Sequence, residues 1–315
     1  MDNILNSIVN SKKIDLLDVI VVDDGSKDRT AELANKFAKE YSDSISVISK
    51  KNGGHGSTIN VGIQYAVGTY FKVVDADDWL SSKNLDLFVG ALMQTQSDLV
   101  FNPFWIYDDK FKKKRLKNVK PQEIPWREER LMSKDELNHL PSIHSYTIKT
   151  SILRDNKISI DEHAYYVDVE YILYPLPYVK TYEFIDIPVY FYRVNQSSQS
   201  ISVENMKKNK VQHEIVLRKV NHYVNKMIDS GYGPENLIVV RLSEMIAAQL
   251  KIISLGGVSR ETRNELRLFY KWAKQNTRFN EKCVNLPIRF LIKSNFRALV
   301  VIHFLAIIKM KVVHI

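Results

Sequence analysis

The chain has 315 residues, 45% of them hydrophobic, so it can bury a sizeable core as one large domain or as one domain with an extension. Its formal net charge of +9 favours an anionic partner, and the lack of a helix-turn-helix, RNP or Cys/His finger pattern argues against nucleic acid as that partner. The one cysteine, Cys283, excludes an internal disulfide, and the acidic amino terminus has no signal-peptide core. We therefore expect a cytoplasmic protein, peripheral at the inner face of the cell membrane.

Helix and strand signals alternate over residues 1–105, which is the pattern of a βαβ sheet. Residues 1–9 carry apolar side chains at the spacing of an amphipathic helix. An apolar strand follows at 18–22 and ends in Asp23 and Asp24, ahead of a glycine turn and a second helix. Ligands of open α/β sheets gather outside the carboxyl ends of the strands, so both carboxylates are candidates for ligand binding.

A glycine-rich loop follows a short predicted strand at 45–48. It begins with Asn52, Gly53 and Gly54, and Gly56 is the third glycine in four positions. Backbone without Cβ atoms can approach a ligand closely, and successive N–H groups can bind an anion. The loop has neither the Lys-Ser/Thr ending of a P-loop nor the spacing of a Rossmann fingerprint.

Three carboxylates lie within four positions after the apolar run 70–74: Asp75, Asp77 and Asp78. Carboxylates crowded at the end of a strand repel one another unless a cation lies among them, and hard oxygen ligands suit Mg²⁺ or Mn²⁺. The alternative is an acidic turn that caps the next helix.

Taken in this order, the strand with Asp-Asp-Gly-Ser, the Asn-Gly-Gly loop and the strand with Asp-x-Asp-Asp resemble the family 2 glycosyltransferases, which have the GT-A fold. The resemblance is strong over residues 1–80 and continues weakly to 202. It implies an α/β, nucleotide-sugar-binding fold in which helices flank a mixed, mainly parallel central sheet.

The resemblance also implies roles for the matching residues. Asp24 would hydrogen-bond the base of a nucleotide-sugar donor, commonly uracil, and Asp75 would lie near the ribose and the metal. Asp77 would bind the metal that bridges the diphosphate. The donor-binding set is then Asp23, Asp24, Asn52, Gly53, Gly54, Asp75 and Arg193.

One departure from the family concerns the amino terminus. Family members usually open with a buried strand and a Pro-x-Tyr-Asn-like turn, whereas residues 1–9 already read as the helix that follows them. In the family that strand lies between the strands that end here at Asp23 and Asp75. Its loss would leave unpaired backbone groups and remove part of the base pocket. We expect either a start codon assigned late or a shortened gene product.

A candidate general base lies in the aromatic region from 144 to 202. An inverting glycosyltransferase needs a carboxylate that takes the proton of the acceptor hydroxyl. Asp168, ahead of the apolar run 169–173, resembles the family's base, although Val167 stands where a glutamate usually precedes it. Helix N-capping is the alternative role for Asp168, and Glu170 is the second candidate for the base.

Other residues of this region are candidates for acceptor or loop contacts: Asp78, His144, Glu170 and Gln199. His144 could contact the acceptor or the leaving phosphate, or be a hydrogen-bonded structural residue. Arg193 offers bidentate contact to a phosphate, ahead of a segment that resembles the family's closing loop. A solvent-facing strand end is the alternative for Arg193.

The carboxy-terminal part, 203–315, is predicted to be a helical extension of a glycosyltransferase domain spanning 1–202. Its last stretch, 282–315, has six Lys/Arg and no Asp/Glu among apolar side chains. Such a segment favours the interface of an anionic membrane. A core helix packed on the catalytic domain is the alternative.

Together these features predict an inverting, metal-dependent hexosyl- or N-acetylhexosaminyltransferase. It would move a sugar from a nucleotide-diphosphate sugar, UDP-linked in the favoured reading, to a hydroxyl of a cell-surface polysaccharide or a lipid-linked glycan intermediate. The alternative is an inactive remnant that binds a partner protein or a membrane.

Overall fold

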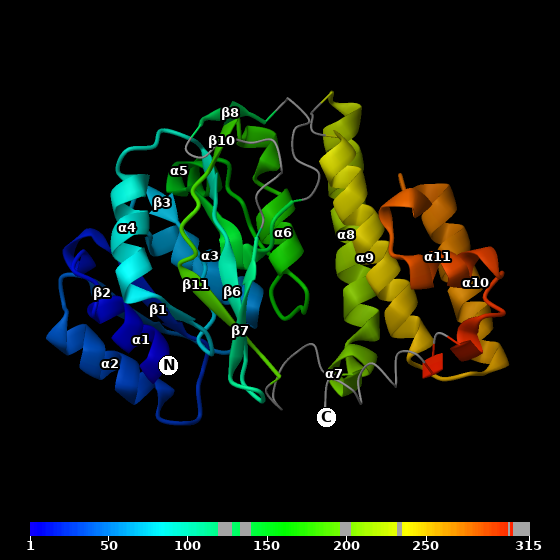
Figure 1. Cartoon of the computed structure of the whole chain (residues 1–315), viewed down its shortest axis with the longest axis horizontal. Coiled ribbons are helices and arrows are strands. Elements are labelled where there is room, and N and C mark those ends of the chain that lie inside the picture. Colours follow the sequence, from blue (N-terminus) through cyan, green and yellow to red (C-terminus); the bar gives the residue numbers. More distant parts are fainter. Residues whose placement is uncertain (119–127, 133–139, 196–202, 232–234, 302, 305–315) are drawn as a thin grey trace. The chain divides into compact units, whose positions relative to one another are not determined.

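The computed structural model describes residues 1–118, 128–132, 140–195, 203–231, 235–301 and 303–304. The chain divides into two compact units, Met1–Gln196 and Ser197–Ile315 (Figure 1). The domain boundary predicted at 202 falls within 196–202, outside the described residues.

The first unit is a mixed α/β structure, as the sequence predicts. Its helices and strands in chain order are α1 (Asp2–Val9), η1 (Ile14–Leu16), β1 (Val19–Asp23), α2 (Thr30–Glu40), β2 (Ile45–Ser49), α3 (His55–Tyr65), β3 (Tyr70–Phe71), β4 (Trp79–Leu80), α4 (Ser82–Leu92), β5 (Leu99–Phe101), β6 (Phe104–Asp108), β7 (Lys113–Lys117), β8 (Arg130–Leu131), η2 (Ile143–Ser145), β9 (Tyr146–Lys149), α5 (Thr150–Asp155), α6 (Asp168–Leu173), η3 (Leu176–Tyr178), β10 (Thr181–Phe184) and β11 (Tyr190–Val194).

Three sheets organise these strands among the described residues. β1 and β2 form a parallel pair, and a five-stranded mixed sheet has the order β3-β9-β5-β10-β8. The third sheet, β4-β11-β6-β7, pairs β11 parallel with β6 and antiparallel with β4. The strands expected at 18–22 and 45–48 are confirmed as β1 and β2.

The amphipathic helix predicted at the amino terminus is confirmed as α1. Ile4, Leu5 and Ile8 are buried, with 6%, 1% and 5% of each residue exposed. They join an apolar core that also draws on β1, α4 and β11. Burial of this face, rather than helix propensity, is what holds so short a helix. The basic residues Lys113–Lys117 form the exposed strand β7, which pairs antiparallel with β6.

The second unit is helical in its described residues, as predicted. Its elements are α7 (Val203–Lys208), α8 (Lys210–Asp229), α9 (Glu235–Ser254), α10 (Arg260–Asn276), η4 (Glu281–Cys283) and α11 (Leu286–Lys293). Within this unit α9 packs against both α8 and α10. No helix among the described residues is long and apolar enough to cross a bilayer.

The described part of the predicted membrane tail packs partly into this unit. Ile288, Leu291 and Phe296 are buried, whereas Phe290 and Phe304 are more than half exposed. The segment therefore has a face in the helical core and a face open to solvent. Residues 305–315, the end of the predicted tail, lie outside the described residues.

Candidate active site

The first group of site residues joins the carboxyl end of β1 to the glycine loop. The Asp24 carboxylate accepts hydrogen bonds from the backbone N–H of Gly53 at 2.8 Å and of Gly54 at 2.7 Å. The Nδ2 of Asn52 donates to the Asp24 carbonyl at 3.0 Å. Two motifs almost thirty residues apart therefore meet, as the strand-end argument predicts. Gly54 has a φ of 81°, a left-handed value that only glycine adopts readily.

Lys50 completes this group, and the sequence argument missed it. Its Nζ donates to Asp24 Oδ1 at 2.8 Å and to Ser57 Oγ at 2.7 Å. Burial by itself would raise the pKa of Asp24, but the hydrogen bonds from Lys50, Gly53 and Gly54 outweigh it and lower that pKa. Asp24 is thus an ionised carboxylate held by three donors. The available signal was the pair of lysines ahead of Asn-Gly-Gly, of which Lys50 is the first.

Asp23 lies beside this group but has a local role. Its side-chain oxygen accepts the N–H of Ser26 at 3.0 Å, which closes the turn after β1. The residue is 8% exposed. The structure therefore brings Asp23 to the predicted edge while assigning its carboxylate to the turn.

The second group gathers around Asp75. One ligand atom from each of Asp75, Asp78 and His144 lies within 4.8 Å of the others. Asp75 Oδ1 is also 3.5 Å from His55 Nε2, and Asp75 Oδ2 is 4.0 Å from His144 Nε2. Burial raises the pKa of Asp75, the nearby imidazole of His55 opposes this, and the charges of Asp77 and Asp168 add to the rise.

Asp78 is the most enclosed carboxylate of this group, at 1% exposure. It accepts hydrogen bonds from the Tyr190 hydroxyl at 2.5 Å and from the Arg193 N–H at 2.7 Å. Burial raises the pKa of Asp78 to about 7, although both hydrogen bonds work against that rise. Asp78 therefore anchors β11 in addition to facing Asp75. From the sequence, Asp78 was expected as one of three crowded carboxylates and as a possible acceptor or loop contact, and the sequence did not reveal its bonds to β11.

Asp77, the metal ligand implied by the resemblance, is exposed and lies outside the trio of Asp75, Asp78 and His144. The reason is local geometry. Residues 75–78 form a turn in which the Asp78 N–H donates to the Asp75 carbonyl at 3.1 Å. The turn brings positions i and i+3 together and leaves Asp77 at its exposed tip.

His144 is held by aromatic packing below Asp75. Its ring stacks on Tyr192 with centroids 4.1 Å apart, and its Nδ1 lies 3.2 Å from Ser142 Oγ. Burial, with smaller effects of Lys72 and His55, lowers the pKa of His144 to about 3, so the imidazole is neutral at physiological pH. Lys72 donates to the His144 carbonyl at 2.8 Å and fixes this segment. These contacts agree with the structural role given as the alternative for His144, and its contact with the acceptor stays a prediction.

The trio suits a divalent cation. Two carboxylates with raised pKa values and a neutral imidazole offer oxygen and nitrogen lone pairs and an excess of negative charge. A carboxylate oxygen that accepts one hydrogen bond keeps a second lone pair, so the contacts of Asp78 do not exclude ligation. The donor set fits Mn²⁺ or Mg²⁺, with Asp77 close enough to affect the Asp75 charge.

The two candidates for the base differ in their surroundings. Asp168 is the first residue of α6, and its charge acts on Asp75 and Tyr192. The N-cap residue of α6 is Val167, without a side-chain capping bond, so the N-capping alternative does not describe Asp168. Glu170 is fully buried, and its two oxygens accept from the Asp161 N–H and the Tyr174 hydroxyl. Glu170 therefore has a structural role.

Arg193 belongs to a neighbouring aromatic and basic face on the sheet β4-β11-β6-β7. Trp79 and Phe191 stack there with centroids 5.2 Å apart, and Lys114 Nζ lies 4.8 Å from the centre of the Trp105 ring. A hollow of about 380 Å³ opens beside them, lined by Asn3, Trp79, Tyr107, Asp109, Lys112 and Arg193. Arg193 donates to Asp109 at 3.1 Å, a pairing that the sequence did not reveal. Gln199 lies outside the described residues.

An α/β unit whose glycine loop and acidic turn meet at the strand ends is what the resemblance to nucleotide-sugar enzymes led us to expect. The family model "Glycosyl transferase family 2" matches residues 1–157, and the chain belongs to this family.

Three similar proteins illustrate the relationship. The glycosyltransferase EpsJ of Bacillus subtilis is 29% identical over 58% of this chain and 54% of its own length. The minor teichoic acid biosynthesis protein GgaB of the same organism is 24% identical over 80% of this chain and 27% of its own length. The chain thus spans about half or less of these relatives. The crystal structure of S. aureus TarS aligns with 95% of this chain and 52% of TarS at a TM-score of 0.54 and 16% identity, a likeness of fold.

Proposed function

We propose that this protein is an inverting glycosyltransferase that moves a sugar from a nucleotide-diphosphate sugar to a hydroxyl of a cell-surface glycan or its lipid-linked intermediate. The observation that carries the proposal is the convergence of two groups in one unit: the ionised Asp24 on the glycine loop, and the trio of Asp75, Asp78 and His144. The first suits a nucleotide base and the second suits the diphosphate end of a donor.

On the donor side, Asp24 is oriented by two backbone amides and kept charged by Lys50. A fixed carboxylate of this kind can accept a ring N–H of a base, such as the N3–H of uracil. The choice of uracil, and of UDP as the carrier, comes from the family resemblance. Asp75, at the start of the acidic turn, stands on the diphosphate side together with His55.

For the transfer step, Asp168 removes the proton of the acceptor hydroxyl. The acceptor oxygen then forms a bond to the anomeric carbon from the face opposite the leaving group. The bond from that carbon to the diphosphate oxygen breaks, and the nucleoside diphosphate leaves with the electron pair. Asp75, Asp78 and His144 would hold a divalent cation, which when bound neutralises the charge that develops on the diphosphate.

On the acceptor side, the aromatic and basic face offers ring planes and cations for a sugar chain that carries negative charge. The relatives named for teichoic acid biosynthesis and as a poly(ribitol-phosphate) beta-glucosyltransferase support an anionic envelope glycan as the acceptor class. The net charge of +9 agrees with this choice.

The decisive experiment is a panel of nucleotide sugars, tested for thermal stabilisation of the protein with Mn²⁺ and for turnover with a polyanionic envelope glycan. We expect a uridine donor to stabilise the protein most. Stabilisation by guanine or thymine nucleotides alone would overturn the uridine assignment. No stabilisation by any donor would favour the inactive remnant.

We further propose that the tail at 282–315 attaches the protein to the inner face of the membrane. In its described part the side chains of Phe290, Lys293, Arg297 and Phe304 are all exposed. Basic residues near an anionic surface contribute about 1 kcal/mol each.

Changing Lys293 and Arg297 together to Gln should therefore weaken binding to anionic vesicles about thirtyfold, which corresponds to two such contributions. Changing Lys36 and Lys83 to Gln removes the same charge from the first unit and serves as the control. Equal sedimentation of both double variants with the vesicles would exclude the tail as the anchor.

A further inference from the structure

A dense block of positive charge lies on the outer strand of the sheet β4-β11-β6-β7. Residues 110–117 contain six Lys or Arg and no Asp or Glu. All five residues of β7 are exposed, and in its described part β7 pairs only with β6, so it is an edge strand (Figure 1). The Asp24 group and the trio use none of these side chains. Like charges so close together repel one another, so the block favours an anionic partner.

The side chains of β7 alternate between the two faces of the sheet. Lys114 stands over the ring of Trp105 and so belongs to the aromatic and basic face. Lys113, Arg115 and Lys117 therefore point to the opposite face. Alternate residues of a strand are about 6.8 Å apart, so these three cations form a row of regular spacing, called the β7 row.

The β7 row shares its face of the sheet with side chains that support the trio. Residues paired directly across neighbouring strands have side chains on the same face. Lys117 pairs with Phe104, which in turn pairs with Tyr190. The Phe104 ring packs against His144 with centroids 5.1 Å apart. The Tyr190 hydroxyl donates to Asp78. One strand spacing, about 4.8 Å, thus separates the row from a strand that supports the trio.

Arg115 lies on the same face. It pairs with Ile106, and Ile106 pairs with Tyr192. The Tyr192 ring stacks on His144 with centroids 4.1 Å apart. Arg115 is therefore two strand spacings, about 10 Å, from a ring that borders the trio. An anion bound along the β7 row is held next to the reaction centre.

The β7 row does not stabilise its own hairpin through ion pairs. Cross-strand pairs of charges are favourable when the two signs are opposite. Arg115 and Lys117 lie opposite apolar residues of β6. Lys113 lies opposite Asp108, whose carboxylate instead accepts two backbone N–H groups in the hairpin turn. No ion pair of these three cations occurs among the described residues.

Protection of the sheet edge is the alternative role for these charges. Charged side chains on an edge strand discourage pairing with another chain. That role needs charge but not charge of a single sign, and mixed charges would serve it without self-repulsion. Six cations without an intervening acid exceed what edge protection requires.

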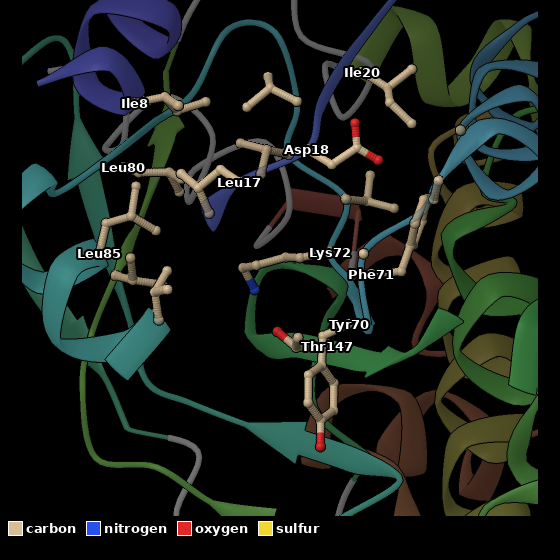
Figure 2. A pocket seen from close by; sticks show the side chains of 18 of the residues that line it. Ile8, Leu17, Asp18, Ile20, Tyr70, Phe71, Lys72, Leu80, Leu85 and Thr147 are labelled. Atoms are coloured by element: carbon tan, nitrogen blue, oxygen red, sulfur yellow. The ribbon is translucent and has the colours of Figure 1, made fainter. Parts of the chain in front are cut away.

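The lysines of the large cavity in the first unit differ from the β7 row. This cavity, of about 760 Å³, lies between β1 and the segment around β3 and has mainly apolar walls (Figure 2). The Nζ of Lys72 at its wall donates to the carbonyls of His144 and Tyr146. Lys149, also at the wall, is bonded to Asp98. These two lysines are used inside the protein, whereas the β7 row is open to solvent.

A linear polyanion fits the β7 row better than a membrane does. Three cations in a row match charges that follow one another along a chain, and the Arg115 guanidinium can bind a phosphate through two N–H groups. A bilayer presents a plane of charge, to which a row on one face offers no more than scattered lysines would. The acidic turn also repels an anionic acceptor, and cations beside it offset that repulsion.

We propose that the β7 row is a binding site for the phosphodiester backbone of the acceptor chain, which it holds by units that do not react. The inference rests on the proposed function for the role of that chain as acceptor. Successive phosphates bind along the row while the reacting unit lies at the trio. Because β7 is the edge of the sheet in its described part, the chain can continue around it to the aromatic and basic face.

The test measures binding of synthetic poly(glycerol phosphate), long enough to span the row, to the full chain by fluorescence anisotropy without donor. The row variant carries Lys113→Gln, Arg115→Gln and Lys117→Gln. The control variant removes the same charge from exposed positions of α2 and α4 through Lys36→Gln, Lys39→Gln and Lys83→Gln. Equal melting temperatures verify that both variants fold.

We expect the row variant to bind the chain about thirtyfold more weakly than the unmodified protein, as the loss of three exposed ion pairs implies. The control variant should lose less than about threefold. The affinity of the row variant should also depend less steeply on salt, because fewer counterions are released. Glycerophosphoglycerol, a single phosphodiester that meets one cation at a time, should lose no more than about threefold. Equal losses for the chain in the row and control variants would overturn the proposal.

Sedimentation with phosphatidylglycerol vesicles distinguishes a bilayer from a chain. We expect the row and control variants to sediment equally with the vesicles. If the row variant instead loses vesicle binding about thirtyfold and keeps its affinity for the chain, the site serves a membrane and the proposal is wrong.

The binding measurements need neither donor nor turnover, so they decide the β7 row even if the transferase activity fails. Where a donor gives turnover with a polyanionic glycan, the row variant should raise KM about thirtyfold and leave kcat within about twofold, because the reacting groups are untouched. Turnover with an unchanged KM in the row variant would overturn the role of the row while leaving the proposed function intact.

Discussion

The Asp24 group and the Asp75 group are both built on carboxylates at strand ends, yet their electrostatics are opposite. Asp24 has three internal donors, so its pKa is lowered despite burial. Asp75 and Asp78 lie among other carboxylates, so burial and like charge raise their pKa values. The first group is complete within the chain, whereas the second has an excess of negative charge that a cation would offset. Equal residue types at equivalent positions thus take different roles through their neighbours.

The largest expected effect is a loss of turnover when the proposed base, Asp168, is changed. Asp168→Asn removes the proposed base and should lower turnover by about a thousandfold. Donor binding should stay unchanged, because Asp168 is not placed in the donor set. Steady-state turnover and calorimetric donor titration measure the two. Loss of less than about tenfold in turnover would move the base elsewhere.

The next test separates the two groups directly. Asp75→Asn should weaken Mn²⁺ binding at least about tenfold, because it removes a proposed ligand. Asp24→Asn should leave Mn²⁺ binding intact and weaken binding of the nucleotide-sugar donor instead. Titration of Mn²⁺ by electron paramagnetic resonance and of UDP by calorimetry gives both affinities. Parallel losses in the two variants would break the distinction between the groups.

The variant Asp77→Asn tests which carboxylates of the acidic turn bind the metal. The family resemblance makes Asp77 the metal ligand, whereas the structure clusters Asp75, Asp78 and His144. If turnover of Asp77→Asn with the true donor stays within about tenfold of the unmodified protein, the metal assignment to Asp77 is wrong. A larger loss, with weaker Mn²⁺ binding, would place Asp77 in the ligand set alongside the trio.

A smaller effect is expected on the free energy of unfolding, for which Asp77 and Asp78 in the acidic turn can be compared. Asp78→Ala leaves the Tyr190 hydroxyl and the Arg193 N–H without their acceptor and should cost about 2 kcal/mol. Asp77→Ala, at an exposed position, should change the free energy of unfolding by less than about 0.5 kcal/mol. Urea unfolding without metal measures both, and equal values would contradict the anchoring role of Asp78.

The pH dependence of stability should differ in sign between the groups. The raised pKa of Asp78 contributes stability that is present below 3.8 and is lost as the pH rises through about 7. The lowered pKa of Asp24 contributes stability that is present above 3.8 and is lost as the pH falls through its folded value.

Without metal, Asp78→Asn should therefore lose less stability than the unmodified protein between pH 5 and pH 8, by about 2 to 3 kcal/mol. Lys50→Met should leave the change in stability between pH 5 and pH 8 nearly as it is in the unmodified protein. At acid pH it should reduce the stability that the lowered pKa of Asp24 contributes. Urea unfolding at pH 3, 5 and 8 tests both. An identical loss between pH 5 and 8 in Asp78→Asn would contradict the raised pKa.

Much of the first group could be predicted because its evidence is local. An apolar strand that ends in Asp23 and Asp24, and a loop whose backbone must approach its partner at Gly53 and Gly54, are visible as residue patterns. The second group was predicted only in part. Asp75 was found, but a strand ends at Phe71 and the residues 75–78 turn, so alternation along a strand did not describe which side chains meet.

The sequence by itself determined the order of strands, loops and acidic turns and the family, because hydrophobic period, glycine and strand-end carboxylates are properties of short segments. Only the tertiary structure decided the partners of the carboxylates: Lys50 for Asp24, Tyr190 and Arg193 for Asp78, and His144 for Asp75. It also formed the cavity between β1 and β3. These pairs are separated by as many as 115 residues. Their contacts depend on how helices and sheets pack, and packing is a sum over the whole core that no short segment contains.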